Sequence, residues 1–237
     1  MVREPAVAGQ FYPGEASTLK ALVAKLTRKD VKRVNALGVV SPHAGLVYSG
    51  PVAGEVFSRV NLPDVYIIIG PNHTGRGRPF SLMKNGSWAT PLGEVKIDEA
   101  LSADLLSHSR FLQDDPTAHA FEHSVEVQLP FIQFFKKDFK FVPIILAHAD
   151  LAAYREIAAN IADAIKKSKK NVLIVASSDM THYEEQKTAS AKDKEAIKAI
   201  LDMDEEKLLK TMLDLNQQAV ELLLITRRVL DSSGDFK

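Results

Sequence analysis

The stretch Asn171–Tyr183 (NVLIVASSDMTHY) is the part of the sequence that best indicates the fold. Its first six residues are mostly apolar and have the length of one strand. A continuous apolar run of this kind is typical of a strand buried on both faces in a parallel sheet. Directly after the run the chain becomes polar and presents Ser178, Asp179 and His182. The stretch therefore predicts a core strand with polar side chains at its carboxyl end.

Two earlier stretches repeat this pattern and each ends in a histidine. Ala36–Val40 (ALGVV) leads into a loop that contains His43, and Val65–Ile69 (VYIII) leads into a loop that contains His73. In open parallel α/β sheets, ligands bind in the crevice outside the carboxyl ends of the strands. We therefore expect His43, His73 and His182 to converge on one site, although they are far apart in the sequence.

The remaining segments supply the helices and strands of an α/β fold. Strands that alternate with helical patterns predict parallel neighbours joined by right-handed crossovers. No internal repeat or linker interrupts residues 1–237, so we predict a single domain with a central mixed, mainly parallel sheet flanked by helices. The predicted helices are Glu15–Arg28, Pro51–Val60, Asp98–Ser107, Glu122–Phe135, Leu151–Lys167 and a broken stretch Glu184–Leu230; further strands are predicted within Phe80–Ile97 and at Lys140–Leu146.

Local turn and proline chemistry refines these predictions. Pro51 suits the first turn of its helix, where its missing N–H has no partner to lose. Asn85-Gly86 is typical of a hairpin turn between two short antiparallel strands. Pro130 should kink or split the helix around it. Pro143 indicates an edge or irregular position within its strand.

Composition narrows the class of protein. The chain carries 30 Lys and Arg against 30 Asp and Glu, so its net charge is zero, which argues against bulk nucleic-acid binding. No apolar stretch reaches the length of a membrane span, and no secretory signal pattern precedes the domain. The chain has no cysteine, which excludes disulfides and thiolate metal ligands within it. We expect a cytoplasmic protein with neither nucleic acid nor membrane as a partner.

Histidines at the ends of core strands suggest a metal centre. Two neutral imidazoles and one anionic oxygen ligand form a facial triad that leaves coordination positions open, typically for non-haem Fe(II). His43 and His73 suit the first two positions, because Pro42 and Pro71 stiffen the turns that carry them. A single histidine at a strand end more often bonds a loop carbonyl, so the argument depends on the repetition of the pattern.

Asp179 and His182 suggest acid–base chemistry beside that centre. If their segment forms a helical turn, their three-residue spacing places both side chains on one face. Asp179 would then orient the imidazole and fix its tautomer. His182 would act as a general base, because the ordinary pKa of histidine lies near the working pH.

A second chemical cluster lies in residues 118–130 (AHAFEHSVEVQLP). His119, Glu122 and His123 match the pattern H-x-x-E-H of inverted zincins, which predicts a zinc hydrolase with Glu122 as its base. Another interpretation is a helix amino terminus with Glu122 placed favourably against the helix dipole. A third has Glu122 and His123 lining the pocket, as contacts to substrate or to the metal ligands.

Other candidate residues are weaker. The basic loop Thr74–Arg78 could close on an anionic substrate through Arg76, although such loops are usually only solvated. Tyr48 and Trp88 could form walls of the cleft, although a single tryptophan is usually part of the core. His148 follows a strand and we interpret it as structural or peripheral. We interpret His108 as a surface residue of a helix.

Six ordered motifs give the sequence a family resemblance. The chain resembles the Memo-like protein family, which is similar to the catalytic subunit of class III extradiol dioxygenases. The resemblance runs from Arg3 to Tyr183 and implies an extradiol-dioxygenase-like α/β fold with a metal-capable pocket. The motifs that carry it are PAVAGQFYP, SPHAGLVYSG, IGPNHTG, WATPLGEV, EHSVEVQLPFI and SSDMTHY.

The resemblance also implies roles for individual residues. It places His43 and His73 on two metal-ligand positions and makes His182 correspond to the general base of the dioxygenases, with Asp179 beside it in the pocket. It makes Glu122 and His123 neighbours of the pocket and the H-x-x-E-H match accidental.

The departure from the family lies near the carboxyl end of the chain. Members usually carry a Cys-Gly-Tyr-Gly-Pro-like segment, whose cysteine resembles the third metal ligand. This chain has no cysteine, and Asn216 leads directly into another helical pattern. One interpretation is that this chain genuinely lacks the segment; the other, which we expect, is that natural segments near Asn216 and after Lys237 are missing. Either leaves the predicted metal site one ligand short or without its metal.

These inferences predict a metal-dependent oxidoreductase with dioxygenase-like activity on an unknown substrate. Iron is the first expectation for the divalent metal, with copper or zinc as alternatives. The second hypothesis is a binding module for phosphorylated or anionic peptides, because eukaryotic members of the resembled family are linked to phosphopeptide recognition. The zinc hydrolase is the third. A small-molecule or anionic peptide ligand is expected, and the oligomeric state is left open.

Overall fold

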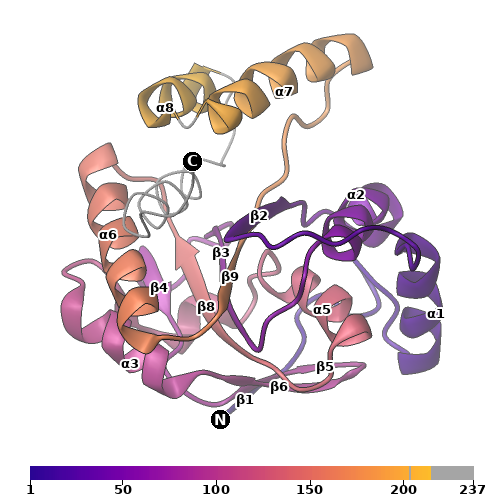
Figure 1. The fold of residues 1–237 in the computed structure, drawn as a ribbon, viewed down its shortest axis with the longest axis horizontal. Coiled ribbons are helices and arrows are strands. Elements are labelled where there is room, and N and C mark those ends of the chain that lie inside the picture. The colour runs from indigo at the N-terminus through magenta and orange to yellow at the C-terminus, as the bar shows by residue number, and fades with distance from the viewer. Residues whose placement is uncertain (203, 215–237) are drawn as a thin grey trace.

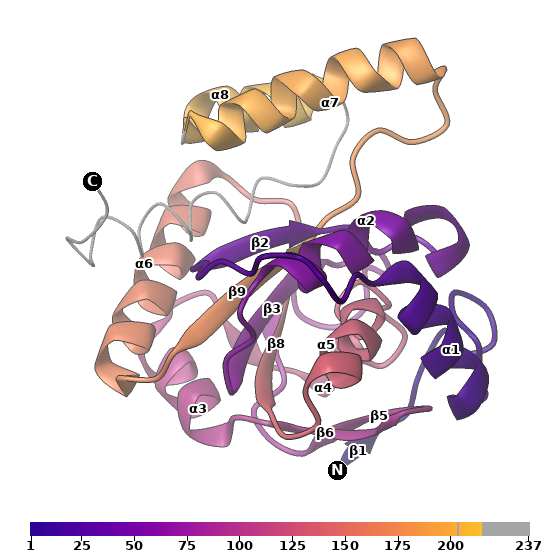
Figure 2. The same cartoon turned by 45° about the vertical axis from the view of Figure 1, so that its right-hand side comes forward.

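A single sheet with helices on both faces organises the computed structural model, which describes residues 1–202 and 204–214 (Figures 1 and 2). The sheet has nine strands, and seven of them follow the order β1-β5-β6-β8-β3-β9-β2. The prediction of an α/β fold with a mixed, mainly parallel sheet is confirmed. The strands are β1 (Val2–Arg3), β2 (Gly38–Ser41), β3 (Val65–Pro71), β4 (Phe80–Leu82), β5 (Ser87–Thr90), β6 (Gly93–Ile97), β7 (Gln113–Asp114), β8 (Lys140–Leu146) and β9 (Val172–Ser177).

Helices cover both faces of the sheet because its central strands are apolar on both faces. In β3, Ile67 and Ile69 join the core under α3 and α6, whereas Tyr66 and Ile68 join the core under α1, α2 and α5. Figure 1 shows these two groups of helices on opposite sides of the sheet. The helices are α1 (Ala16–Leu26), α2 (Leu46–Arg59), α3 (Glu99–His108), α4 (Pro116–His119), the 3₁₀ helix η1 (Glu126–Gln128), α5 (Leu129–Phe135), α6 (Leu151–Ser168), α7 (Gln186–Leu201) and α8 (Glu205–Asp214).

The three strands that were predicted to carry the site are neighbours. The order β3-β9-β2 places β9 between the other two, and both pairings are parallel. Ala176 of β9 pairs with Ile69, and Ser177 pairs with Ser41. Because parallel strands end on the same edge, the loops after all three strands start side by side.

Pro143 lies in a break of the hydrogen-bond ladder, as its chemistry predicts. On one side of β8 the pairing with β3 is continuous. On the other side β6 pairs with the start of β8 and β4 with its end, and neither reaches residue 143. Lys140 donates to Asp64 on the β3 side, whereas Phe141 accepts from Asp98 on the other side. Along a strand, the backbone N–H and C=O groups of successive residues point alternately to the two neighbouring strands. The backbone groups of odd-numbered residues in β8 therefore face the break, and Pro143 has no N–H to leave unpaired there.

Three local predictions are wrong. The hairpin joins β5 to β6 through Pro91 and Leu92, whereas β4 pairs with β8 and β7, so Asn85-Gly86 joins strands that are not partners. α2 starts at Leu46, and Pro51 therefore lies inside it. The predicted helix Glu122–Phe135 is helical only from residue 126 onward.

That last error has a physical cause in the polar residues of the segment. Glu122, Ser124 and Glu126 are fully buried and bond to backbone and side-chain groups from other parts of the chain. Such bonds compete with helical hydrogen bonding. Pro130 lies in the first turn of α5, where its missing N–H is harmless.

The carboxyl-terminal helices follow a long connection from β9. α7 and α8 pack against each other, and Arg155 of α6 forms an ion pair with Glu205 of α8. The helical pattern predicted for Glu184–Leu230 is thus confirmed as far as residue 214, with its break at the expected place. Met203 and the segment around Asn216 lie outside the described residues. Among the described residues, no helix is both long and apolar enough to cross a membrane.

Candidate metal centre

Three histidines meet beside the carboxyl ends of β2 and β3. His43 follows β2, His73 follows β3, and His123 comes from the irregular segment between α4 and η1. One ring nitrogen of each lies within 4.8 Å of the corresponding atoms of the other two. The ring centroids of His73 and His123 are 4.6 Å apart, and that of His43 lies 5.2 Å and 5.4 Å from them. We call these three residues the histidine cluster.

Hydrogen bonds define which nitrogen of His43 carries its proton. The Ser177 hydroxyl donates its only hydrogen to the Ser124 carbonyl and accepts a bond from the Gln128 amide at 2.8 Å. It can therefore only accept from Nδ1 of His43, which lies 2.9 Å away. His43 thus holds its proton on Nδ1, and its Nε2 keeps a free lone pair. A metal ligand needs that arrangement.

Glu122 does the same for His73 from a fully buried position. Its carboxylate accepts from Nδ1 of His73 at 2.9 Å and from the backbone N–H groups of His73, His123 and Ser124. Burial alone would raise the pKa of Glu122, but the bonds from His73 and Ser124 outweigh it and lower the pKa to about 2. Glu122 is therefore an anion that fixes His73 with Nε2 free.

A glycine lets this carboxylate segment lie against the end of β3. A Cβ atom on Gly70 would lie 2.3 Å from the Ser124 hydroxyl oxygen and 2.7 Å from its Cβ. Neither contact is sterically allowed, so any side chain at residue 70 would push Ser124 away. Gly70 thereby keeps Ser124 within reach of Ser177, and Glu122 within reach of His73.

Asp179 lies between two imidazoles. One of its oxygens accepts from the backbone N–H groups of His43 and Ala44, at 2.7 Å and 3.1 Å. The other lies 3.3 Å from Nε2 of His182 and 3.8 Å from Nε2 of His43. The predicted pair of Asp179 and His182 therefore forms, but in an irregular loop and not in a helical turn. The side chain of His182 is half exposed, which leaves it accessible to a ligand.

Burial keeps two members of the cluster, His43 and His123, in the form that binds metals. Desolvation lowers the pKa of His43 to about 4, although the Asp179 carboxylate acts in the opposite direction. Burial is also the main cause that lowers the pKa of His123, against the effect of Glu122. Both imidazoles are therefore neutral at pH 7. Neutral nitrogen donors suit zinc, copper, iron and nickel, so the residues present fit a divalent transition metal.

His119 takes no part in the cluster. It ends α4, so the H-x-x-E-H pattern does not lie on one helix. Its ring is fully buried, 5.7 Å from the Trp88 ring centroid, and burial is the main cause that lowers its pKa to about 3. The zinc site of an inverted zincin is therefore wrong for this chain, since Glu122 is bonded to His73. Trp88 belongs to the core and not to a wall of the cleft.

Other candidate residues lie on the surface. Tyr48 is 84% exposed on α2, and Arg76 is exposed with its guanidinium 4.6 Å from the Phe121 ring centroid. Their roles as substrate contacts stay predictions. His108 and His148 are exposed, as interpreted from the sequence.

Sequence reasoning missed several residues that build the centre. It assigned His123 to the pocket wall and not to the cluster, and it gave Ser177, Gln128 and Glu126 no role. One signal was available, because residues 122–128 (EHSVEVQ) carry five polar residues immediately before an apolar helix. Polar groups that recur in a segment bound for the core must find partners there.

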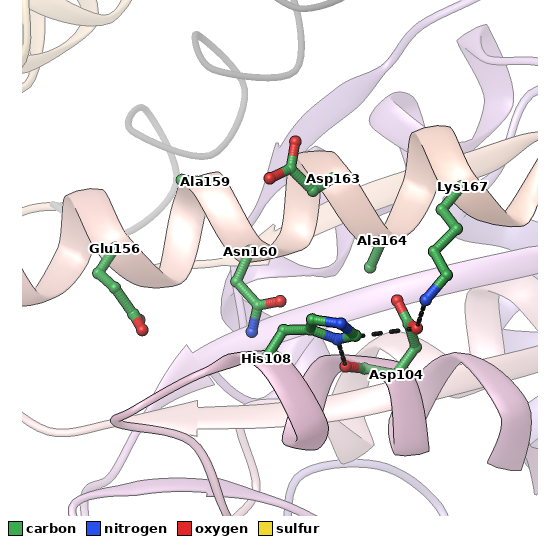
Figure 3. Close-up of a pocket in the computed structure, with 8 residues that line it drawn as sticks. All are labelled: Asp104, His108, Glu156, Ala159, Asn160, Asp163, Ala164 and Lys167. Atoms are coloured by element: carbon green, nitrogen blue, oxygen red, sulfur yellow. Dashed lines mark hydrogen bonds and ion pairs between the residues drawn. The ribbon is translucent and has the colours of Figure 1, made fainter.

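A second group of polar side chains lies between two helices on one face of the sheet (Figure 3). It is a groove of about 350 Å³ between α3 and α6, and we call it the α3–α6 groove. Asp104 and His108 face it from α3, and Glu156 and Lys167 face it from α6.

Comparison with known proteins identifies the family of the chain. The family model described as Memo-like protein matches residues 3–221. The chain belongs to this family. The match extends past Tyr183, where the sequence motifs stopped.

Several curated members of the Memo family resemble the chain over most of its length. A MEMO1 family protein of Methanopyrus kandleri is 41% identical over 219 residues, which cover 86% of this chain and 77% of the relative. One of Pyrobaculum aerophilum is 43% identical over 216 residues with the same coverage. One of Thermotoga neapolitana is 42% identical over 215 residues, covering 84% of this chain and 77% of the relative.

Proposed function

We propose that this Memo-family protein holds a divalent metal ion with the histidine cluster and acts as a metal-dependent oxidoreductase with dioxygenase-like activity on a small molecule. Iron is our first assignment, with copper and zinc as alternatives. The observation that supports this most is the fixed protonation of two imidazoles, since Ser177 and Glu122 hold the Nδ1 protons of His43 and His73. Side chains that only stabilise a fold do not need ring nitrogens of three histidines within 4.8 Å of one another.

His182 and Asp179 would have different roles beside such an ion. A bound iron would supply Lewis acidity and redox chemistry. His182 would take a proton from the substrate, because it is accessible and its Nε2 lies 3.3 Å from Asp179. Asp179 would stabilise the imidazolium that forms, while its other oxygen keeps the His43 loop in place.

Metal content tests the proposal directly. The wild-type protein, His43→Ala and the control His148→Ala are reconstituted anaerobically with Fe(II), desalted, and analysed for bound iron. We expect close to one iron per chain in the wild type and in His148→Ala, and almost none in His43→Ala. If the wild type holds no iron, or if all three proteins hold the same amount, the proposed metal-dependent function is wrong.

A second function is favoured by the exposed pair of Arg76 and Phe121. A guanidinium over an aromatic ring, on the loop that follows His73, offers a contact for an anionic group of a peptide. In this alternative the protein is a non-catalytic binding module. Calorimetry with a phosphorylated peptide would separate the two, because metal-independent binding that is lost in Arg76→Ala would favour the module. We place either function in the cytoplasm, with neither nucleic acid nor membrane as a partner.

A further inference from the structure

Arg3 is buried although it lies next to the start of the sequence. Its side chain is 5% exposed and forms an ion pair with Glu126. Its Nε donates to the His119 carbonyl at 3.0 Å, and its Nη2 donates to the Glu122 carbonyl at 2.7 Å. The guanidinium also lies 4.2 Å from the Trp88 ring centroid. One side chain thus holds three points of the segment from His119 to Glu126.

Glu126 receives the rest of the N-terminal segment. Its fully buried carboxylate accepts from the backbone N–H groups of Ala6 and Val7, at 2.7 Å and 3.1 Å, and from the Tyr12 hydroxyl. A buried charge pair is tolerated when additional hydrogen bonds satisfy its remaining atoms, and this one meets that condition. The segment from Arg3 to Tyr12 and the segment from His119 to Glu126 are therefore fixed to each other.

Phe11 connects this network to the histidine cluster. Its ring meets the His123 ring edge to face, with centroids 4.7 Å apart. Its carbonyl accepts from the N–H of Leu46, which follows the His43 loop. The N-terminal segment thus contacts the surroundings of two of the three histidines. We call Arg3, Phe11, Tyr12 and Glu126 the N-terminal clamp.

The segment that carries His123 needs an external anchor. Residues 120–125 form neither helix nor strand, so no regular hydrogen-bond ladder fixes their backbone. Within the segment, the Glu122 carboxylate folds back on the N–H groups of His123 and Ser124. The Glu122 carbonyl is held from outside by Arg3. A displacement of about 1 Å in such a segment is enough to spoil a binding geometry.

We propose that Arg3 is a positioning residue of the metal centre, which acts through the N-terminal clamp to hold Glu122 and His123 where the histidine cluster can bind an ion. The inference rests on the proposed metal-binding function. It requires the guanidinium specifically, because its planar fork reaches several acceptors at once, whereas a lysine ammonium is a single point of charge.

Arg3→Lys is the decisive variant, because it keeps the charge beside Glu126 and removes the fork. Ile157→Val is the matched control, since it removes one methylene from the core under α6, on the other face of the sheet. Anaerobic Fe(II) titration against a chelator should give a dissociation constant at least about 10-fold higher for Arg3→Lys, and an unchanged one for Ile157→Val. An unchanged constant for Arg3→Lys would overturn the proposal.

Two further measurements distinguish failure of the proposed metal binding from failure of the proposed role of Arg3. If the wild type binds no iron, the proposed function fails, and the clamp is judged in the metal-free protein by the nuclear Overhauser effect between the Phe11 and His123 rings. Loss of that effect in Arg3→Lys supports the clamp, and its persistence overturns it. If Arg3→Lys does not fold, Phe11→Leu replaces it in the iron titration. Weaker iron binding then supports the clamp, and wild-type affinity overturns it.

Discussion

The histidine cluster and the α3–α6 groove are built from the same residue types but differ in how their charges are arranged. In the groove, Asp104 pairs with Lys167 beside it, and Glu156 accepts from Ser109 and the backbone of Arg110. These groups lie partly in water, and each has a partner close by. Beside the histidine cluster, Glu122 is fully buried, and its carboxylate accepts from the ring and the backbone N–H of His73. Buried carboxylates that orient imidazoles indicate a functional site, whereas neighbouring exposed charges indicate solvation.

Removing one carboxylate charge beside the histidine cluster and one in the α3–α6 groove should give the largest difference in stability and metal affinity. Glu122→Gln puts an amide donor among N–H groups, so we expect a loss of about 2–4 kcal/mol in the free energy of unfolding. Metal affinity should fall about 100-fold, because His73 loses the group that orients it. The matched variant Glu156→Gln in the groove should change stability by less than about 1 kcal/mol. Urea unfolding and chelator competition measure both, and equal effects in the two variants would contradict the distinction.

A pH dependence of stability is the next largest expected effect. Burial lowers the folded-state pKa values of His43 to about 4 and of His119 to about 3. Below the ordinary histidine pKa of about 6.5 the unfolded chain takes up protons that the folded chain does not. The free energy of unfolding should therefore decrease as the pH falls from about 6.5 toward 4, by up to about 1.4 kcal/mol per pH unit for each group. Denaturant unfolding at several pH values measures this slope.

Two variants assign that slope to buried histidines. His119→Phe removes one titrating group from a fully buried position and should flatten the pH dependence. His108→Ala, in the groove, removes an exposed group and should leave the slope as it is. A slope that is reduced equally by both variants would refute the assignment.

A smaller effect should follow from changing one hydroxyl in each place. Ser177→Ala removes the acceptor that holds the Nδ1 proton of His43, so metal affinity should fall about 10-fold with only a modest change in stability. Ser109→Ala removes the hydroxyl that donates to Glu156 in the groove and should leave metal affinity unchanged. Isothermal titration of both variants with Fe(II) is the measurement. A Ser177→Ala protein with wild-type affinity would mean that the bond to Ser177 does not tune His43.

The smallest effect is expected within the groove itself. Asp104 is partly exposed and Lys167 is mostly exposed, and such pairs contribute about 0–1 kcal/mol. A double-mutant cycle with Asp104→Asn and Lys167→Met should therefore give a coupling energy below about 1 kcal/mol, which shrinks further in salt. A coupling several times larger would show that the groove stores interaction energy and deserves a functional explanation.

The sequence predicts the strands that carry the candidate site much better than it predicts the contacts between the loops. The apolar runs before His73 and Asp179 correctly predicted buried parallel strands, because burial on both faces leaves no polar position within such strands. The run before His43 was wrongly predicted as a core strand: it forms β2, which is parallel but lies at the end of the strand order and is only partly buried. Loop contacts carry no comparable periodicity. The place of His123 depends on Gly70, whose missing side chain lets a distant segment approach, and on Arg3, more than a hundred residues away in the sequence. Contacts of this kind follow from tertiary packing and leave no local pattern.

Pro143 determines how one side of β8 is shared between two other strands. Two strands that run in opposite directions, β6 and β4, dock on the same side of β8 and meet at this residue. Because proline offers no N–H there, either strand would meet a missing donor in the ladder if it extended past this residue. This side of β8 therefore offers two separate pairing positions with independent registers. A shift of β4 or β6 along β8 need not move β3, because β3 pairs with β8 on its other side and carries His73 independently of them.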